Sequence, residues 1–583
     1  MAPKSKKAPS KKKMTKAERL RLMQEEEERR LKEEEEARLK FEKEEQERLE
    51  IQRIEREKWS LLEKKDLERR SQELEELALL EGCFPEAEKQ KREIRALAQW
   101  KHYTECDGSP DPWVAQEMNT FISLWEEEKN QAFEQVMEKS KLVLSLIEKV
   151  KLILLETPTY ELDHRTVLQH QGSILRLQEL LSLKINVATE LLLRTSDSEG
   201  EDSQTTQLEL EMKLLSEAVL AAQLCLVENV VELPEASQAY KVDLCHFSTL
   251  GGVYHLDVLE LPPQCKPVKG WVLVEILQEG LQRFIYPPDT TEEPDPDVTF
   301  PPIEVTLEIH KSVIFFERPR VVRWDNEGKF WRSDGISSVY YNREDRLLTF
   351  SMDTLGPVTL IQDAHVNMPY QSWEMSPCGM NKVLLIVKTV FMELQIYIKE
   401  NLCMLASVKL RGKGLEFHLK GKWMAPIPFI LALKEAGLNI FPAVYSHFYV
   451  VINNKVPQVE LKAYRQMALL SSAFSFGWSK WNMVCNSTRV VIRVREQLSE
   501  ETEHHTWSLL MFSGDRAQML KMQEENDKFS EALREGTEFH STLYHMMKDF
   551  ASPVAMERVR HSNCQFIDSV CYMLLSIRVL SYS

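Results

Sequence analysis

The stretch "EEEERRLKEEEEARLKFEKEEQERLE", residues 25–50, contains almost no apolar side chains, so it cannot contribute to a globular core. It belongs to a longer run from Glu18 to about Leu80 in which Glu, Lys, Arg, Leu and Gln dominate, with neither Gly nor Pro. These residue types favour a helix. We therefore expect one long helix, and at a rise of about 1.5 Å per residue some 60 residues would reach about 90 Å, longer than a domain is wide.

Acidic residues stand four positions before basic ones along the first half of this helix, the order that best stabilises an isolated helix. Each pair adds only about 0.2–0.5 kcal/mol, but a series of pairs can support a helix that packs on nothing. The pairs are Glu25 with Arg29, Glu26 with Arg30, Glu28 with Lys32, Glu34 with Arg38, Glu36 with Lys40 and Glu44 with Arg48.

A coiled coil is the competing interpretation, and it requires apolar residues at positions a and d over several heptads. Between residues 25 and 48 only Leu31, Ala37, Leu39 and Phe41 qualify, and they do not keep a heptad. Apolar residues become more frequent after Ile51. We therefore expect a solvated helix whose C-terminal part docks on a partner or on the rest of the chain.

The charge of the 583-residue chain is unevenly distributed. The formal net charge is -17, but residues 1–17 hold seven lysines and no acid, so the remainder carries -24. A basic tail on an acidic body favours contact between the tail and an acidic partner, and it disfavours nucleic acid as a partner of the body. The alternative is a disordered, solubilising end. The tail lysines are the candidate contact residues: Lys4, Lys6, Lys7, Lys11, Lys12, Lys13 and Lys16.

The sequence gives no sign of a membrane span or of secretion. No stretch approaches the roughly 20 apolar residues that a span needs, and the basic N-terminus lacks the apolar region of a signal peptide. The ten cysteines are scattered and never form a C-x-x-C pair. We therefore expect free, mostly buried thiols in a reducing, intracellular compartment.

The pattern of apolar residues predicts a multidomain α+β protein. The tail (1–17) and the long charged helix (18–99) precede a helical domain, 100–233. In that domain Asp111 is the expected N-cap and Pro112 the first residue of a helix to about Leu155. Further helices are expected over 163–193 and 207–230, separated by the acidic, Ser-rich insertion "TSDSEGEDSQTT", 195–206, which has the composition of a disordered segment.

Beyond about residue 240 the apolar period changes from helical to alternating, as in "VTLEIH" from Val305 and "MELQIYI" from Met392. Turn signals such as "DNEG" (325–328) separate the strands. We expect a sandwich-like antiparallel β domain over 240–409, a small α+β module over 410–515, and C-terminal helices over 516–583.

No catalytic or metal-binding signature is present in the sequence. The chain lacks a phosphate-binding loop and a nucleophile elbow. The small clusters of possible metal ligands, Cys245-His246 with His255 and His504-His505, lack a second pair at zinc spacing, so we interpret them as structural. We expect no metal, no cofactor and no enzyme activity. The chain has the features of a structural or adaptor subunit.

Two further clusters resemble functional sites but have simpler interpretations. Aromatic residues gather between residues 324 and 341 without a basic groove beside them, so packing in a core or hairpin accounts for them better than nucleic-acid binding. The glycine-lysine run "RGKGLEFHLKGK", 411–422, lacks the spacing of a phosphate loop and predicts a strand, a turn and a strand with the lysines outside. The aromatic residues are Trp324, Phe330, Trp331, Tyr340 and Tyr341.

Two stretches resemble the dynein axonemal intermediate chain 7 family, also called cancer susceptibility candidate 1 or lung adenoma susceptibility protein. They are "MTKAERLRLMQEEEERRLKEEEEARLK" (14–40) and "WKHYTECDGSPDPWVAQEMNTFISLWEEE" (100–128). The second is the more particular, with its Trp-x-x-Tyr and Cys-Asp-Gly-x-Pro-Asp-Pro. "GKFWRSDGISSVYYN" and "LGPVTLIQ" are also similar to the family's C-terminal region, so the resemblance covers most of the chain.

The resemblance implies a subunit of inner-arm axonemal dynein in cilia and flagella that contacts tubulin and other dynein chains and has no motor of its own. A cytosolic factor for dynein assembly is the alternative. One feature of other intermediate chains is missing: no Gly-His to Trp-Asp signature repeats every 40–45 residues, so we expect no WD40 propeller.

Overall fold

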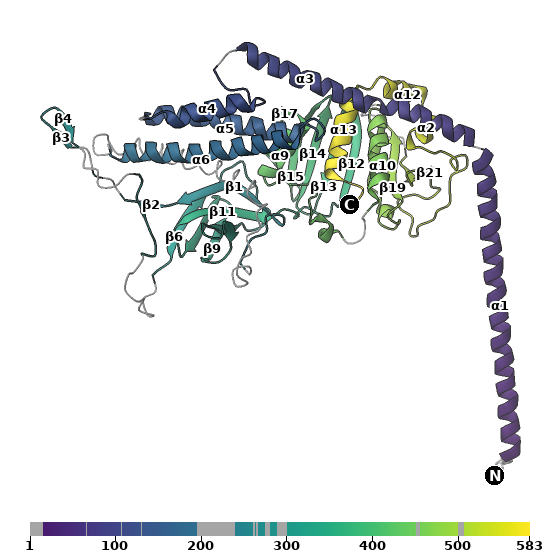
Figure 1. Ribbon diagram of the computed structural model, residues 1–583. Coiled ribbons are helices and arrows are strands. Elements are labelled where there is room, and N and C mark those ends of the chain that lie inside the picture. Colours follow the sequence, from purple (N-terminus) through teal and green to yellow (C-terminus); the bar gives the residue numbers. More distant parts are fainter. Residues whose placement is uncertain are drawn as a thin grey trace, which may run out of the picture. The chain divides into compact units, whose positions relative to one another are not determined.

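A computed structural model gives the architecture of the chain (Figure 1). It describes residues 16–65, 67–105, 108–129, 131–194, 240–260, 263, 266–273, 280–288, 300–450, 455–498 and 506–583. Residues 1–15, the insertion 195–206, the expected helix 207–230 and His504-His505 lie outside the described residues. The chain divides into two compact units, residues 1–75 and 76–583.

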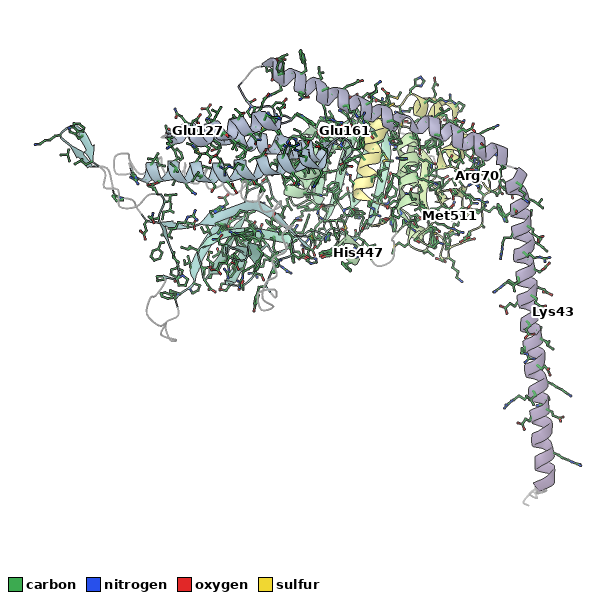
Figure 2. The ribbon with its side chains drawn as sticks, in the orientation of Figure 1. Lys43, Arg70, Glu127, Glu161, His447 and Met511 are labelled. Carbon is green, nitrogen blue, oxygen red and sulfur yellow. The ribbon has the colours of Figure 1, made fainter. Side chains whose placement is uncertain are left out.

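The first unit is dominated by helix α1 (Lys16–Lys65), and helix α2 (Leu67–Glu81) begins within it. Side chains project from α1 on all sides, Lys43 among them (Figure 2). Of the expected ion pairs only Glu28 with Lys32 has both side chains described, and this pair is not formed. Among the described side chains Arg38 pairs with Glu42, and Arg53 with both Glu50 and Glu57. In two of these three pairs the base precedes the acid, because long side chains reach either neighbouring turn.

The second unit opens with the last turn of α2 and with α3 (Cys83–Glu105), which follows Gly82. Three more helices form a bundle around a shared apolar core that includes Trp125: α4 (Ala115–Glu127), α5 (Phe133–Glu156) and α6 (His164–Arg194). The prediction of a single helix from Asp111 to Leu155 is wrong in two respects. Val114 is the N-cap of α4, and two helices are present, because α4 ends at Glu127 and α5 begins at Phe133. Asp111 instead accepts a hydrogen bond from the backbone N–H of Trp113, at 2.9 Å.

A β-sandwich follows the bundle but is smaller than the expected domain of 240–409, because the strands after residue 371 belong to another sheet. One sheet has the strand order β1-β11-β7-β8 and the other β6-β10-β9. Both supply side chains to one core, with Leu250 and Leu360 from the first sheet and Phe350 from the second. The strands are β1 (Phe247–Leu256), β6 (Ile303–Glu308), β7 (Arg320–Asp325), β8 (Phe330–Arg332), β9 (Ile336–Asn342), β10 (Leu347–Met352) and β11 (Gly356–Asp363).

Two small two-stranded sheets are also present. Strand β2 pairs with β5, and β3 pairs with β4, both antiparallel. Their bounds are β2 (Val258–Leu259), β3 (Lys266–Val268), β4 (Trp271–Leu273) and β5 (Arg283–Phe284).

The largest element is a ten-stranded antiparallel sheet with the order β16-β15-β14-β13-β12-β18-β19-β20-β21 and with β17 also paired to β15. It crosses residue 410, the expected boundary between two domains, because β12 pairs with β18 at Met375 and Phe476. The strands are β12 (Ser372–Gly379), β13 (Lys382–Lys388), β14 (Met392–Lys399), β15 (Leu402–Leu410), β16 (Lys413–Leu415), β17 (Trp423–Met424), β18 (Phe474–Gly477), β19 (Val490–Glu496), β20 (Ser508–Phe512) and β21 (Ala517–Met519).

Helices pack on this sheet and complete the main core, which includes Leu394, Phe429, Met467 and Leu574. They are α9 (Pro426–Glu435), α10 (Pro457–Leu470), α11 (Leu543–Phe550), α12 (Pro553–Arg560) and α13 (Cys564–Ile577), with short 3-10 turns η2 (Ser446–Tyr449) and η3 (Lys480–Asn482). The fold is mixed α+β, and the described strands form open sheets with no propeller or closed barrel, as predicted. No described helix has the length and apolarity to cross a bilayer.

Candidate functional site

The candidate contact residues of the tail cannot be placed in three dimensions. Lys4, Lys6, Lys7, Lys11, Lys12 and Lys13 lie outside the described residues, and Lys16 is the first residue of α1, with a side chain that is not described. What the structure does define is how residues 76–105, the end of α2 and all of α3, pack within the second unit.

The last turn of α2 is anchored by both apolar and charged contacts. Leu77 is 8% exposed and belongs to the main core. One residue earlier, the Glu76 carboxylate accepts hydrogen bonds from Lys548 Nζ at 2.7 Å and 2.8 Å, and it lies 3.1 Å from His545 Nε2. Burial acts to raise the pKa of Glu76, but hydrogen bonds and charge from Lys548 and His545 outweigh it, so the pKa is lowered. The charged form of Glu76 is therefore the one that holds α2 against α11.

Helix α3 continues this attachment along α13. The guanidinium of Arg465 in α10 lies 5.4 Å from the ring centroid of Phe84, a cation–π distance. Farther along, Lys91 Nζ pairs with Asp568 of α13 at 2.6 Å. The end of α2 and all of α3 are therefore part of the second unit and pack against its core.

The far half of α3 is held by the loop between α5 and α6. Glu161 from that loop (labelled in Figure 2) pairs with Arg92. Its other oxygen lies 3.2 Å from Arg95 Nη2, which also contacts Glu88 at 3.1 Å. Near the end of α3, Gln99 donates a hydrogen bond at 3.3 Å to Asp111, which lies between α3 and α4. These contacts fix α3 to the helical bundle as well as to the sheet body.

Cys245, His246 and His255, the possible metal ligands that the structure describes, do not form a metal site. Among the described residues no three His, Cys, Asp or Glu side chains converge as a metal site requires. His246 lies 3.3 Å from the Tyr449 hydroxyl, and the imidazole of His255 is buried, which lowers its pKa. Cys245 is exposed. The structural interpretation of these residues is consistent with this arrangement.

A buried Ser–His contact, which the sequence analysis missed, joins the small sandwich to the main body. Ser446 Oγ of η2 lies 2.9 Å from His365 Nδ1, and His365 Nε2 lies 3.2 Å from the carbonyl oxygen of Cys245. Both side chains have no exposed surface. Burial lowers the pKa of His365, which keeps the ring neutral. No sequence signal could have revealed this pair, because the two residues are 81 positions apart.

This Ser–His contact does not have the geometry of a nucleophilic site. In a Ser-His-Asp triad a carboxylate contacts the second nitrogen of the histidine, but in His365 that nitrogen faces the carbonyl oxygen of Cys245. The nearby Asp363 accepts a hydrogen bond from the Tyr449 hydroxyl at 2.7 Å instead. Its other oxygen accepts from the backbone N–H of His365, also at 2.7 Å. With Ser446 fully buried, the cluster fastens η2 to strand β11 and is closed to a substrate.

Lys455 is the most unusual titratable residue of the second unit. It is 1% exposed, and burial lowers the pKa of its ammonium to about 8. Its acceptors are four backbone carbonyls in the segment 482–489, those of Asn482 at 2.8 Å, Cys485 at 3.3 Å, Asn486 at 3.2 Å and Arg489 at 2.8 Å. These backbone acceptors hold the ammonium in place, and the side chains of Glu460 and Cys485 interact with it only through charge, so we interpret Lys455 as a structural clamp.

The aromatic residues between 324 and 341 are mainly core residues, as expected. Trp331 is 2% exposed and Phe330 7%, and the rings of Trp324 and Trp331 meet edge to face at 5.3 Å. Tyr340 is the exception, with an exposed side chain.

The expectation of mostly buried thiols is wrong for the described cysteines, of which Cys403 and Cys571 alone are buried. No disulfide joins the described cysteines, as expected.

These observations define a class of protein: a mixed α+β chain with open sheets, led by a long charged helix. Comparison with known proteins identifies the family. Residues 29–213 match the family model "Cancer susceptibility candidate 1 N-terminus". The chain is 80% identical to "Dynein axonemal intermediate chain 7" of Mus musculus over all of both chains, and 57% identical to that of Homo sapiens over 98% of this chain and 99% of the relative.

More distant relatives carry the same name. A "Dynein axonemal intermediate chain 7 homolog" of Ciona intestinalis is 30% identical over 79% of this chain and 84% of the relative. The chain belongs to the dynein axonemal intermediate chain 7 family, as the two stretches in the sequence indicated.

Proposed function

We propose that this chain is a non-catalytic adaptor subunit of axonemal inner-arm dynein. In this role it acts as a scaffold in the axoneme of cilia and flagella, where it contributes to motility, and it is also present in the cytoplasm before assembly. The observation that carries the proposal is full-length similarity to proteins named dynein axonemal intermediate chain 7. An enzyme would need converging reactive groups in an accessible site, and the buried Ser446–His365 pair does not offer one.

The partners proposed are microtubules through tubulin, and other intermediate and heavy chains of the dynein. The seven tail lysines would meet the acidic surface of tubulin, and α1 would set a distance between that contact and the folded body. The docking of α2 and α3 on the main core supports this role, because a spacer transmits position only if one end is fixed. Neither nucleic acid nor a membrane is a proposed partner.

Microtubule co-sedimentation tests the tail contact. Replacing all seven lysines with glutamine is expected to weaken binding, and added salt is expected to weaken binding of the wild type, since exposed charges are screened over about 10 Å at 0.1 M. Arginine at the same seven positions is the matched control, because it keeps the charge. Unchanged binding of the glutamine variant at low salt would move the contact to the body.

Salt extraction of axonemes separates the proposal from the alternative, a cytosolic factor for dynein assembly. An adaptor subunit should be released together with inner-arm dynein. A chain that is absent from washed axonemes but present in the cytoplasmic fraction would support the assembly factor instead.

A further inference from the structure

The glycine-lysine run of the sequence forms one complete edge of the ten-stranded sheet. Strand β15 turns at residues 411–412 into β16, and after a short loop β17 returns to the same strand. Leu410 faces Lys413 and Met404 faces Trp423 across these pairings, and Leu405 bridges Lys420 between them. We call residues 409–424 the basic edge. The expected strand, turn and strand with outward lysines are present.

The turn fixes which backbone groups of this edge remain unpaired. Arg411 has φ 47° and Gly412 φ 82°, the positive values that a two-residue type I′ hairpin requires. In such a hairpin the residues that flank the turn, here Leu410 and Lys413, form a hydrogen-bonded pair, and the next pair does not. Gly414, which faces Lys409 in that next pair, therefore directs its N–H and C=O away from the sheet.

The basic edge contrasts in charge with the body that carries it. Residues 409–422 contain five basic residues and one acid, a formal charge of +4, whereas the chain after its tail carries -24. Two of the five are neutralised, since Lys409 pairs with Glu393 and Lys420 with Glu416, both at 2.7 Å. Within the described part of the chain no ion pair is formed by the other three, which are all exposed: Arg411, Lys413 and Lys422.

We propose that the basic edge binds an acidic, extended polypeptide segment of a partner protein, which adds as a strand beside β16. The outward N–H and C=O of Gly414 give the added strand its backbone partners. The three unpaired cations select for carboxylates. The inference stands apart from the proposed role of the tail lysines, because it concerns a different unit of the chain.

Charge also argues against the other occupants of an exposed strand. Lysines on a sheet edge disfavour pairing with a second copy of the same edge, because like charges would meet. Nucleic acid would have to approach a body of strongly negative charge, and it makes no use of outward backbone groups in a β conformation. An acidic peptide satisfies both the charges and the backbone of this edge.

Fluorescence anisotropy of the full chain with a labelled peptide of alternating Glu and Thr tests the proposal. We expect binding that weakens with salt, and binding about tenfold weaker when Arg411, Lys413 and Lys422 are all replaced by glutamine, as the loss of several exposed ion pairs predicts. The matched control replaces Lys129, Arg165 and Lys528, which are exposed and belong to other surfaces, by glutamine. It makes the same change in net charge and should bind as the wild type does.

A second pair of variants tests the backbone contact without changing charge. Gly414→Pro removes the outward N–H and leaves the ladder to β15 intact, so it should also weaken binding several-fold. Gly414→Ala is its control, since a Cβ there would meet no atom within 4 Å and the N–H remains. Thermal melting of each variant verifies that the body is folded.

Three results would overturn the proposal. One is equal loss of binding in the two triple variants, which would reduce the effect to net charge. Another is full binding by Gly414→Pro, which would exclude an added strand. The third is displacement of the peptide by single-stranded oligothymidine at lower concentration than by unlabelled peptide, which would make the edge a nucleic-acid site.

Discussion

The attachment of the leading helices to the body can be tested at a single side chain, Leu77. Leu77 is 8% exposed, whereas Leu79 on the same helix is 82% exposed. Leu77→Ala removes about three buried carbon groups at roughly 0.8 kcal/mol each, so it should cost the docked helix about 2.5 kcal/mol. The cavity term should be small at the rim of the core, because neighbouring side chains can relax into the space.

Hydrogen exchange followed by mass spectrometry measures this loss directly. If the end of α2 opens locally, a loss of about 2.5 kcal/mol should make exchange of its amides about fiftyfold faster, at tenfold per 1.4 kcal/mol. Peptides from β13 and β14 should be unchanged. Leu79→Ala makes the same chemical change and has the same helix propensity, so it is the matched control.

The outcome that would refute this reasoning is equal exchange in the two variants. It would mean that burial of Leu77 does not stabilise the attachment, and that Glu76 and Lys548 hold α2 alone. A rise in exchange throughout the body of the Leu77 variant would be a different result, because it would show that α2 is part of the global folding unit and not a separable attachment.

Two further predictions concern the leading helix and the buried lysine. A fragment of residues 14–80 should be mainly helical by circular dichroism in dilute buffer, and it should lose helicity as salt screens its ion pairs. A random-coil spectrum, with or without tubulin, would contradict the idea of a self-supporting spacer. For Lys455, the folded pKa of about 8 lies below the ordinary 10.5, so between these values the unfolded chain binds more protons and stability should rise with pH, by up to about 3 kcal/mol. Urea unfolding at about pH 8 and pH 10.5 should show a higher free energy of unfolding at the higher pH in the wild type, and no such difference in Lys455→Met. If the two proteins have the same dependence on pH, the four carbonyls keep the amine protonated in the folded state.

Patterns local in sequence predicted much of the fold. The helix α6 and the strands β6 and β14 lie where the apolar period placed them, and the turn at 325–328 separates β7 from β8. The break between α4 and α5 was not predicted. At this break the backbone carbonyls of Glu126 and Glu128 accept hydrogen bonds from Lys184 of α6. These contacts join segments more than fifty residues apart, so a local pattern does not show them.

By itself, the sequence determined the elements and the family. The spacing of apolar residues predicts helices and strands, and stretches such as 100–128 indicate the family. Each of these signals depends only on residues that are neighbours in the sequence. Tertiary structure alone decided which elements share a core. It joined the strands on either side of residue 410 into one sheet, brought Leu77 beside the main core, and turned a run of glycines and lysines into an exposed edge. The physical reason is that hydrogen bonds between strands and the burial of apolar surface act between residues that are close in space, whatever their separation along the chain.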